Sequence, residues 1–364
     1  MRDRHVHVRR GAEAGDASPV RGHRRLGRSR GLPAALTAVL LCGALAAAGH
    51  PARAAVPPTA ADPAAGTEAP GPLEPPTPNV LPSLIRNLVA YYDFEHPVPG
   101  NAAQERDLGF SGTNIDLVNG GDLMRVPDGA HPGSSSSLQT KQVNPTIAGN
   151  DDWKAGVYSA SGVPTLRAFN GVKEATIMGW VKMTGPNPSL DSNTADPNDY
   201  FGAIGLAGVL SGNSDGHAVR ALLEIISVSG ELRVVALGRR VDTGSSQTFA
   251  AREDWQAILP QGEWVFLAAT FDYDNGTMRL YRNGRPLDGF YTLSNDPWGV
   301  SGPPEPDLSS ATDPRGIKVG GSFPQNTLER NPCNCRQDSL MFLDRALTDG
   351  EVLLQYRWAT KQHP

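Results

Sequence analysis

The chain has 364 residues, of which 40 are Gly and 31 are Pro, while only 20% are charged. This share of Gly and Pro favours turns and short strands over long helices. The first 54 residues contain ten Arg and three acidic residues, so the remainder carries a formal charge of −12. Such an acidic chain repels the phosphates of nucleic acids and anionic lipids, which argues against nucleic-acid partners and membrane-surface binding.

The N-terminal residues 1–54 have the order of a secretory signal peptide. An Arg-rich stretch precedes the apolar run Leu32–Ala48, and Ala52-Arg53-Ala54 supplies the small residues that a signal peptidase reads. The apolar run is shorter than the about 20 strongly apolar residues that a membrane span needs. We therefore expect cleavage before Ala55, export of the mature chain to the extracellular side, and no membrane span after signal removal.

A linker is predicted after the signal peptide. Residues 55–86 are rich in Pro and Ala and have no apolar period. Such a segment cannot bury enough apolar surface to offset its ordering entropy, so we expect it to be disordered and extended. The remaining residues, 87–364, are predicted to form a single domain.

The domain is predicted to consist mainly of β-strands. Apolar and polar residues alternate most clearly in Glu174–Met183, Leu232–Leu237 and Trp264–Phe271. Two Asn-Gly pairs, Asn275-Gly276 and Asn283-Gly284, suit tight hairpins, and they predict three successive antiparallel strands.

One short C-terminal helix completes the predicted fold. It begins with the capping box Thr348–Glu351, after which Val352, Leu353 and Tyr356 fall on one face. The sequence therefore predicts an all-β, two-sheet antiparallel sandwich with a short C-terminal helix.

Several segments of this domain follow one another in a recognisable order: Val89–Glu95, Asp107–Gly112, Asp116–Gly120, Ala175–Lys182, Gly262–Phe271, Leu280–Gly284, Ile317–Gly321 and Asp338–Leu347. Together they resemble a laminin-G-like jelly roll of the concanavalin A-like lectin and glucanase superfamily. The resemblance extends from about Val89 to Thr360. Gly185–Tyr200 and Thr292–Gly316 depart from compact members of the family and are expected to be long inserted loops.

The resemblance also implies a calcium site, because the first and last strands of such jelly rolls are neighbours. The matching positions are Asp107 and Asp338, with Glu95, Asp93 and Asn114 as further candidate ligands. Calcium takes six to eight oxygen ligands, which carboxylates and amides can supply. The alternative is that Asp107 and Asp338 only cap turns.

The sequence offers two patterns that could indicate an enzyme. A G-x-S-x-G pattern surrounds Ser214, but His217 is too close in sequence to serve as the usual downstream base, so a polar turn explains the pattern better. A glucanase needs two carboxylates on one strand face. Glu224 has no acidic partner at that spacing, and Glu105 and Asp107 lie in a loop-like segment. We expect no enzymatic activity.

Cys333 and Cys335 are the remaining cysteines after signal removal. In an exported chain they are expected to form a local disulfide at the entry to the last strand, provided that the backbone bends there. A zinc site would need further His or Cys ligands nearby, and the sequence has none. A thiol pair directed at a partner stays open as an alternative.

Aromatic side chains on loops are candidates for stacking against sugar rings. Trp298 lies in the long Pro-rich loop, and Trp255 follows an acidic turn, whereas Trp180 and Trp264 lie in alternating strands. The sequence therefore predicts a secreted, non-catalytic binding module for a glycan or a surface polymer. An adhesion module that binds protein and an esterase that uses Ser214 remain as alternatives.

Overall fold

The computed structural model describes residues 78–143, 151–170, 174–185, 204–211, 219–239, 246–273, 275–293, 313–321, 323 and 332–361. All of them belong to one unit of the chain, Glu68–Pro364. The predicted signal peptide lies outside the described residues, as do most of the predicted linker and of the two predicted inserted loops. None of the described helices is long and apolar enough to cross a membrane.

Strands make up most of the described residues. They are β1 (Leu88–Tyr92), β2 (Pro97–Val98), β3 (Asn101–Glu105), β4 (Ile115–Val118), β5 (Arg125–Val126), β6 (Ser137–Thr140), β7 (Lys154–Tyr158), β8 (Glu174–Met183), β9 (Ile204–Leu210), β10 (Val219–Val228), β11 (Glu231–Arg239), β12 (Ser246–Ala251), β13 (Val265–Asp272), β14 (Thr277–Arg282), β15 (Arg285–Pro286), β16 (Gly289–Tyr291), β17 (Gly316–Val319) and β18 (Cys335–Leu343). The helices are α1 (Trp255–Ile258), α2 (Asp349–Ala359) and the 3-10 helices η1 (Pro82–Asn87), η2 (Gly121–Met124) and η3 (Pro164–Phe169).

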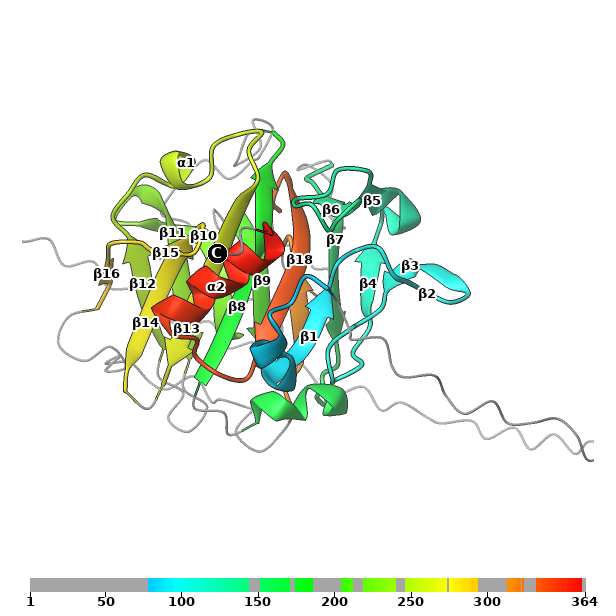
Figure 1. Cartoon of the computed structure of the whole chain (residues 1–364), viewed down its shortest axis with the longest axis horizontal. Coiled ribbons are helices and arrows are strands. Elements are labelled where there is room, and N and C mark those ends of the chain that lie inside the picture. The colour runs from blue at the N-terminus through cyan, green and yellow to red at the C-terminus, as the bar shows by residue number, and fades with distance from the viewer. Residues whose placement is uncertain are drawn as a thin grey trace, which may run out of the picture. The chain divides into compact units, whose positions relative to one another are not determined.

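The strands form two sheets that pack face to face (Figure 1). Sheet A has the order β15-β14-β13-β8-β18-β6-β5, and β1 also pairs with β18. Sheet B has the order β16-β12-β11-β10-β9-β17-β7-β4-β3-β2. The strand pairs are antiparallel, as in β13 with β8 and β1 with β18. The predicted all-β sandwich is therefore confirmed.

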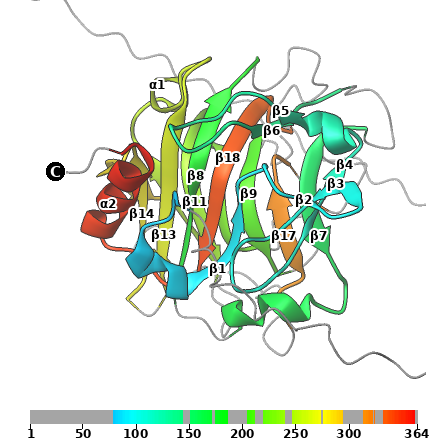
Figure 2. The same cartoon turned by 45° about the vertical axis from the view of Figure 1, so that its right-hand side comes forward.

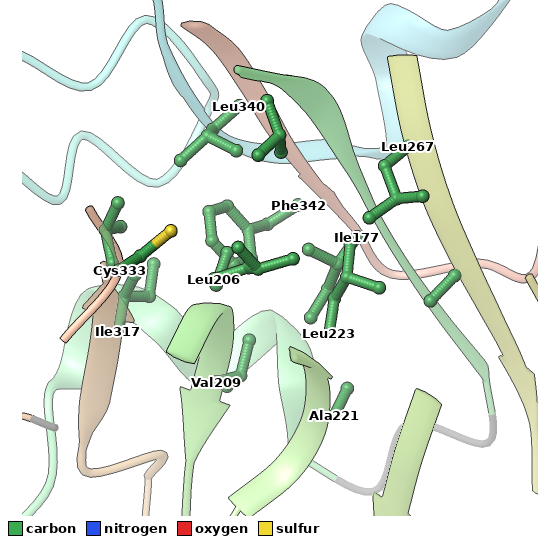
Figure 3. Packing of buried hydrophobic residues seen from close by; sticks show 14 of the residues in the cluster. Ile177, Leu206, Val209, Ala221, Leu223, Leu267, Ile317, Cys333, Leu340 and Phe342 are labelled. Atoms are coloured by element: carbon green, nitrogen blue, oxygen red, sulfur yellow. The ribbon is translucent and has the colours of Figure 1, made fainter. Parts of the chain in front are cut away.

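The main core lies between the sheets and is built by alternation along the strands. In β8, Ile177 and Val181 point into this core, whereas Met178 and Trp180 belong to a second apolar cluster on the outer face of sheet A. Figure 3 shows Ile177 facing Leu223 of sheet B across the core. Because both of its faces are covered, β8 is buried over nearly its whole length.

Helix α2 lies outside sheet A, beside β13 and β14 (Figure 2). It covers the second apolar cluster on that face. Its N-terminus has the predicted capping box, in which Thr348 and Glu351 satisfy each other's backbone N–H groups. Val352 and Ala359 are buried against the sheet, and Tyr356 is half-buried. The predicted helix and its buried face are thus confirmed.

The predicted linker extended too far along the chain. Residues 78–86 are part of the folded body, and Val80 and Leu84 are buried in the cluster under α2. The Gln355 side chain donates to the Asn79 carbonyl (2.8 Å) and accepts from the Leu81 N–H (2.7 Å). A few apolar residues after the prolines are enough to order this segment, because a helix face is available to receive them.

Candidate functional site

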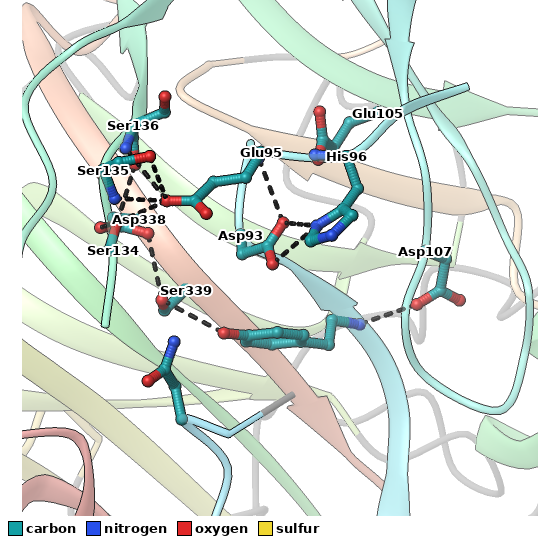
Figure 4. Close-up of polar contacts among 12 residues, drawn as sticks. Asp93, Glu95, His96, Glu105, Asp107, Ser134, Ser135, Ser136, Asp338 and Ser339 are labelled. Carbon is teal, nitrogen blue, oxygen red and sulfur yellow. Dashed lines mark hydrogen bonds and ion pairs between the residues drawn. The ribbon is translucent and has the colours of Figure 1, made fainter. Parts of the chain in front are cut away.

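The predicted ligands Asp338 and Glu95 lie near each other at a loop of three serines, Ser134–Ser136 (Figure 4). One oxygen of Asp338 accepts hydrogen bonds from the Ser134 hydroxyl (2.7 Å) and the Ala130 N–H (2.8 Å). One oxygen of Glu95 accepts from the hydroxyl of Ser135 (3.1 Å) and from the N–H groups of Ser135 and Ser136. Asp338 thus holds the serine loop against β18, and Glu95 holds it against the segment that follows β1.

Asp107 lies at a different place and organises its own turn. Its two oxygens accept from the N–H groups of Tyr91 (2.8 Å), Gly109 (2.7 Å) and Thr113 (2.8 Å) and from the Ser111 hydroxyl (2.6 Å). Burial raises the pKa of Asp107 above its ordinary range, although these hydrogen bonds oppose the shift. The carboxylate is therefore surrounded by hydrogen-bond donors of the protein itself.

The arrangement does not fit a calcium ion shared by Asp107 and Asp338. Tyr91 stands between them, since its N–H donates to Asp107 while its hydroxyl donates to Ser339, the residue beside Asp338 (3.2 Å). A cation needs several oxygens that converge on one point. Within the described part of the chain, no three His, Cys, Asp or Glu side chains gather in a way that could hold a metal ion.

A buried hydrogen-bonded chain links Asp338 to His131. His131 Nδ1 accepts from the Gly133 N–H (3.3 Å), so its Nε2 carries the proton and donates to the Ser339 hydroxyl (2.9 Å). Ser339 in turn donates to Asp338 (3.0 Å). Burial lowers the pKa of His131 to about 4 and raises that of Asp338 to about 7.

This chain does not have the geometry of a hydrolytic triad. Here Ser339 donates its hydrogen bond to Asp338 and accepts one from His131, whereas in a triad the serine would donate to the histidine and the carboxylate would orient the histidine. Ser339 is only 1% exposed, so no substrate reaches its hydroxyl. Ser214 and His217, the esterase candidates of the sequence, lie outside the described residues.

The remaining acidic candidates also lack a catalytic pairing. Glu105 is buried and forms an ion pair with Arg125 (2.6 Å), and it accepts from the His96 N–H (3.0 Å). Asp107 points to its own turn. The two carboxylates therefore do not form the dyad of a glucanase.

The cysteine prediction is supported, because Cys333 and Cys335 form a disulfide with a Cα–Cα distance of 5.2 Å. Both residues are buried in the main core at the start of β18.

The aromatic candidates for sugar stacking are Trp255 and Trp298. Trp255 begins α1 and is only 8% exposed, so its ring is part of the core and offers no open platform. Trp298 lies outside the described residues.

An open polar pocket lies where α2 begins, on the outer face of sheet A. Its volume is about 450 Å³, and its lining comes from β13, β14 and the segment 346–350: Thr270, Asp272, Thr277, Arg279, Tyr281, Ala346, Leu347, Thr348, Asp349 and Gly350. Alternate residues of β14 share this face, as the period of a strand requires. Arg279 and Asp349 are about half exposed, so solvent reaches the pocket.

The rim of the pocket is held by hydrogen bonds from the neighbouring strand β8. The Ala346 N–H donates to Glu174 (3.0 Å), and the Leu347 N–H donates to the hydroxyl of Thr176 (3.1 Å). That hydroxyl donates in turn to the Arg345 carbonyl (2.7 Å). The segment before α2 is thereby fixed in place before any ligand binds.

Sequence reasoning missed this pocket. The signal that could have located it is the polar side of β14, where Thr277 and Arg279 alternate with the buried Met278 and Leu280. That α2 begins beside these side chains is a long-range contact that no local pattern encodes.

Comparisons with known proteins give only distant structural likeness. No family model matches the chain, and no curated protein does. The binding domain of botulinum neurotoxin DC, solved in complex with rat synaptotagmin II, is 12% identical with a TM-score of 0.44, and the match covers 75% of this chain and 52% of that chain. Trypanosoma rangeli sialidase is 12% identical with a TM-score of 0.43, covering 76% and 33%.

A third solved structure, the botulinum neurotoxin serotype D binding domain, is 11% identical with a TM-score of 0.43, and the match covers 76% of this chain and 52% of that chain. The chain thus spans about half the length of the neurotoxin chains and a third of the sialidase chain. Likeness at these scores carries no conclusion about ligand or activity.

Proposed function

We propose that this chain is a secreted, non-catalytic module that binds a carbohydrate or another surface polymer outside the cell. On this proposal the sandwich is a laminin-G-like jelly roll, carried on a Pro-rich stalk after removal of residues 1–54. The observation that carries the proposal is the open polar pocket at the start of α2, which is lined by carboxylate, guanidinium and hydroxyl groups. Such groups recognise the hydroxyls of sugars.

The non-catalytic part of the proposal is supported by the hydrogen bonds that already engage the candidate carboxylates. Three of the buried carboxylates, Glu105, Asp107 and Asp338, are each engaged by donors of the protein itself. None of these three faces the pocket lining. A binding role needs only a shaped, polar and accessible surface, which the pocket supplies.

A glycan array probed with the exported chain tests this proposal. We expect selective binding to a related set of glycans, with no cleavage of the bound glycans on prolonged incubation. Binding to no glycan would refute carbohydrate recognition and favour another surface polymer or a protein as the ligand. Labelling by a fluorophosphonate probe that is lost in Ser214→Ala would instead establish the esterase reading.

A further inference from the structure

The carboxylates of the pocket limit the charge of its ligand. Asp349 accepts from Arg279 with both oxygens (2.9 and 2.8 Å), and one of these oxygens also accepts from the Tyr281 hydroxyl (2.9 Å). Asp272 accepts from the N–H (2.9 Å) and the side-chain amide (2.7 Å) of Asn275. Arg279, which carries the single guanidinium of the described lining, is therefore already paired with the carboxylate of Asp349.

The net charge of the lining follows directly. Asp272 and Asp349 supply two negative charges, Arg279 supplies one positive charge, and no further Arg or Lys belongs to the described lining. A ligand anion would meet this excess negative charge at short range without a free cation to balance it. Carboxylate oxygens have lone pairs for several donors, so further donors from a ligand can be accepted.

The rest of the lining suits the uncharged parts of a sugar. The Thr277 hydroxyl can donate and accept, and no hydrogen bond occupies it among the described contacts. The Thr348 hydroxyl already donates to Glu351 and accepts from the Glu351 N–H, so it offers a ligand no donor. Ala346 is half-buried and adds a small apolar surface against which the C–H face of a pyranose can pack, whereas Leu347 is buried in the cluster under α2. The pocket thus combines acceptors, hydroxyls and a small apolar wall.

We infer that this pocket binds one sugar unit that donates hydrogen bonds to Asp272 and Asp349 and carries no negative charge, that is, a neutral sugar or an amino sugar. Uronates, sialates and sulfated sugars are excluded from it. This inference rests on the proposed function and specifies its ligand class and location. It is independent of Trp298 and of calcium.

One variant tests the location of the site and its charge preference on the same glycan array. In Thr277→Tyr, a large ring is placed into the pocket from an exposed strand position, with a residue type that strands favour. We expect the wild-type signals to come from neutral and amino sugars and to be lost in this variant. Thermal melts of both proteins should agree within a few degrees, which establishes that the variant folds.

The outcomes separate the inference from the proposed function. Signals that persist in folded Thr277→Tyr would place the glycan elsewhere and overturn the inference. Signals from anionic glycans that are lost in Thr277→Tyr would overturn the charge preference. Absence of any signal from the wild type would refute carbohydrate recognition, the part of the proposed function on which this inference rests.

A matched pair of Asp-to-Asn variants then tests the role of the carboxylate. For a bound neutral or amino sugar, Asp349→Asn should raise the Kd at least fivefold in calorimetric titration, since one charged acceptor is lost. Asp122→Asn, at a side chain that is 72% exposed and remote from the lining, should leave the Kd unchanged. Equal Kd values in both variants would contradict a direct role of Asp349.

Discussion

At the scale of single residues, the buried carboxylates of β18 and the loops around it determine how stability depends on pH. Asp338 is fully buried, and burial raises its pKa to about 7, against the ordinary value of about 4. The folded protein therefore holds a proton there over a pH range in which the unfolded chain has lost it. Stability from this group is highest below about pH 4 and falls as the pH rises to about 7.

Replacement of Asp338 by Asn should flatten this dependence. The amide keeps an acceptor for Ser134 and Ala130 but cannot ionise. We expect urea unfolding to show that the wild type loses stability relative to Asp338→Asn as the pH rises from 5 to 8. The opposite contribution of His131, whose pKa is lowered to about 4, is common to both proteins. Asp122→Asn, at an exposed site, serves as the control and should behave like the wild type. Parallel pH profiles for Asp338→Asn and the wild type would contradict the assignment.

Calcium is tested at the same residues. Since Asp107 and Asp338 each accept hydrogen bonds from the protein and are separated by Tyr91, we expect EDTA to leave the melting temperature of the wild type unchanged. A fall of several degrees with EDTA, together with its disappearance in Asp338→Ala, would instead establish the ion that the family resemblance implies.

These residues show what sequence can and cannot predict about the site. Asp107 and Asp338 stand out in the sequence, and both are buried at key junctions of the fold. Their partners are backbone N–H groups and serine hydroxyls, as for Asp107 with Gly109 and Thr113. Sequence patterns do not specify such partners, because they depend on where a loop crosses a strand.

At the scale of elements, α2 depends on a charged cap at its N-terminus. Arg345 donates two hydrogen bonds to Glu351 (2.9 and 2.8 Å), and these, with the hydrogen bonds from Thr348, lower the pKa of Glu351 to about 2. The resulting stability is present above the unfolded pKa of about 4 and is lost as the pH falls towards 2.

Glu351→Gln should therefore destabilise the protein most near neutral pH. We expect a loss of about 1–3 kcal/mol in the free energy of unfolding at pH 7, as is typical when a hydrogen bond to a charged group is removed. The difference from the wild type should shrink towards pH 2. A difference that is constant over this range would show that the carboxylate charge contributes nothing.

The turn between β14 and β15 gives a second test at this scale. Gly284 has a φ of +76°, and a Cβ atom added there would lie 3.0 Å from the Cα atom of Leu353 in α2. Gly284→Ala should lower the free energy of unfolding by about 1–2 kcal/mol, through the left-handed backbone and the crowding of α2. Gly262→Ala, also at positive φ but with open space around it, separates the two causes.

Elements with strong local patterns were predictable. The strands β8 and β13, the Asn283-Gly284 turn and α2 agree with the alternation and capping signals of the sequence. The 3-10 helix η1 and residues 78–81 before it could not be predicted from local patterns. Their conformation depends on contacts with Gln355 and Trp358, which lie more than 270 residues away in the sequence.

At the scale of the whole molecule, the sandwich places its candidate binding surface outside the core. The inner faces of the two sheets form the main core, whereas the pocket lies on the outer face of sheet A, beside α2. The first residues that the structure describes lie close to the other end of that helix, where the Trp358 side chain donates to the Pro78 carbonyl (3.0 Å). A ligand can therefore be bound without rearrangement of the core.

The central claim is that a glycan binds in the pocket at the start of α2, and amide chemical shifts during a titration test it most directly. With isotope-labelled protein and a glycan identified on the array, we predict that the largest shifts occur in residues 270–281 and 346–350. The serine loop Ser134–Ser136 and the Asp107 turn should be unaffected. Largest shifts outside the pocket segments, or none at saturating glycan, would contradict the account.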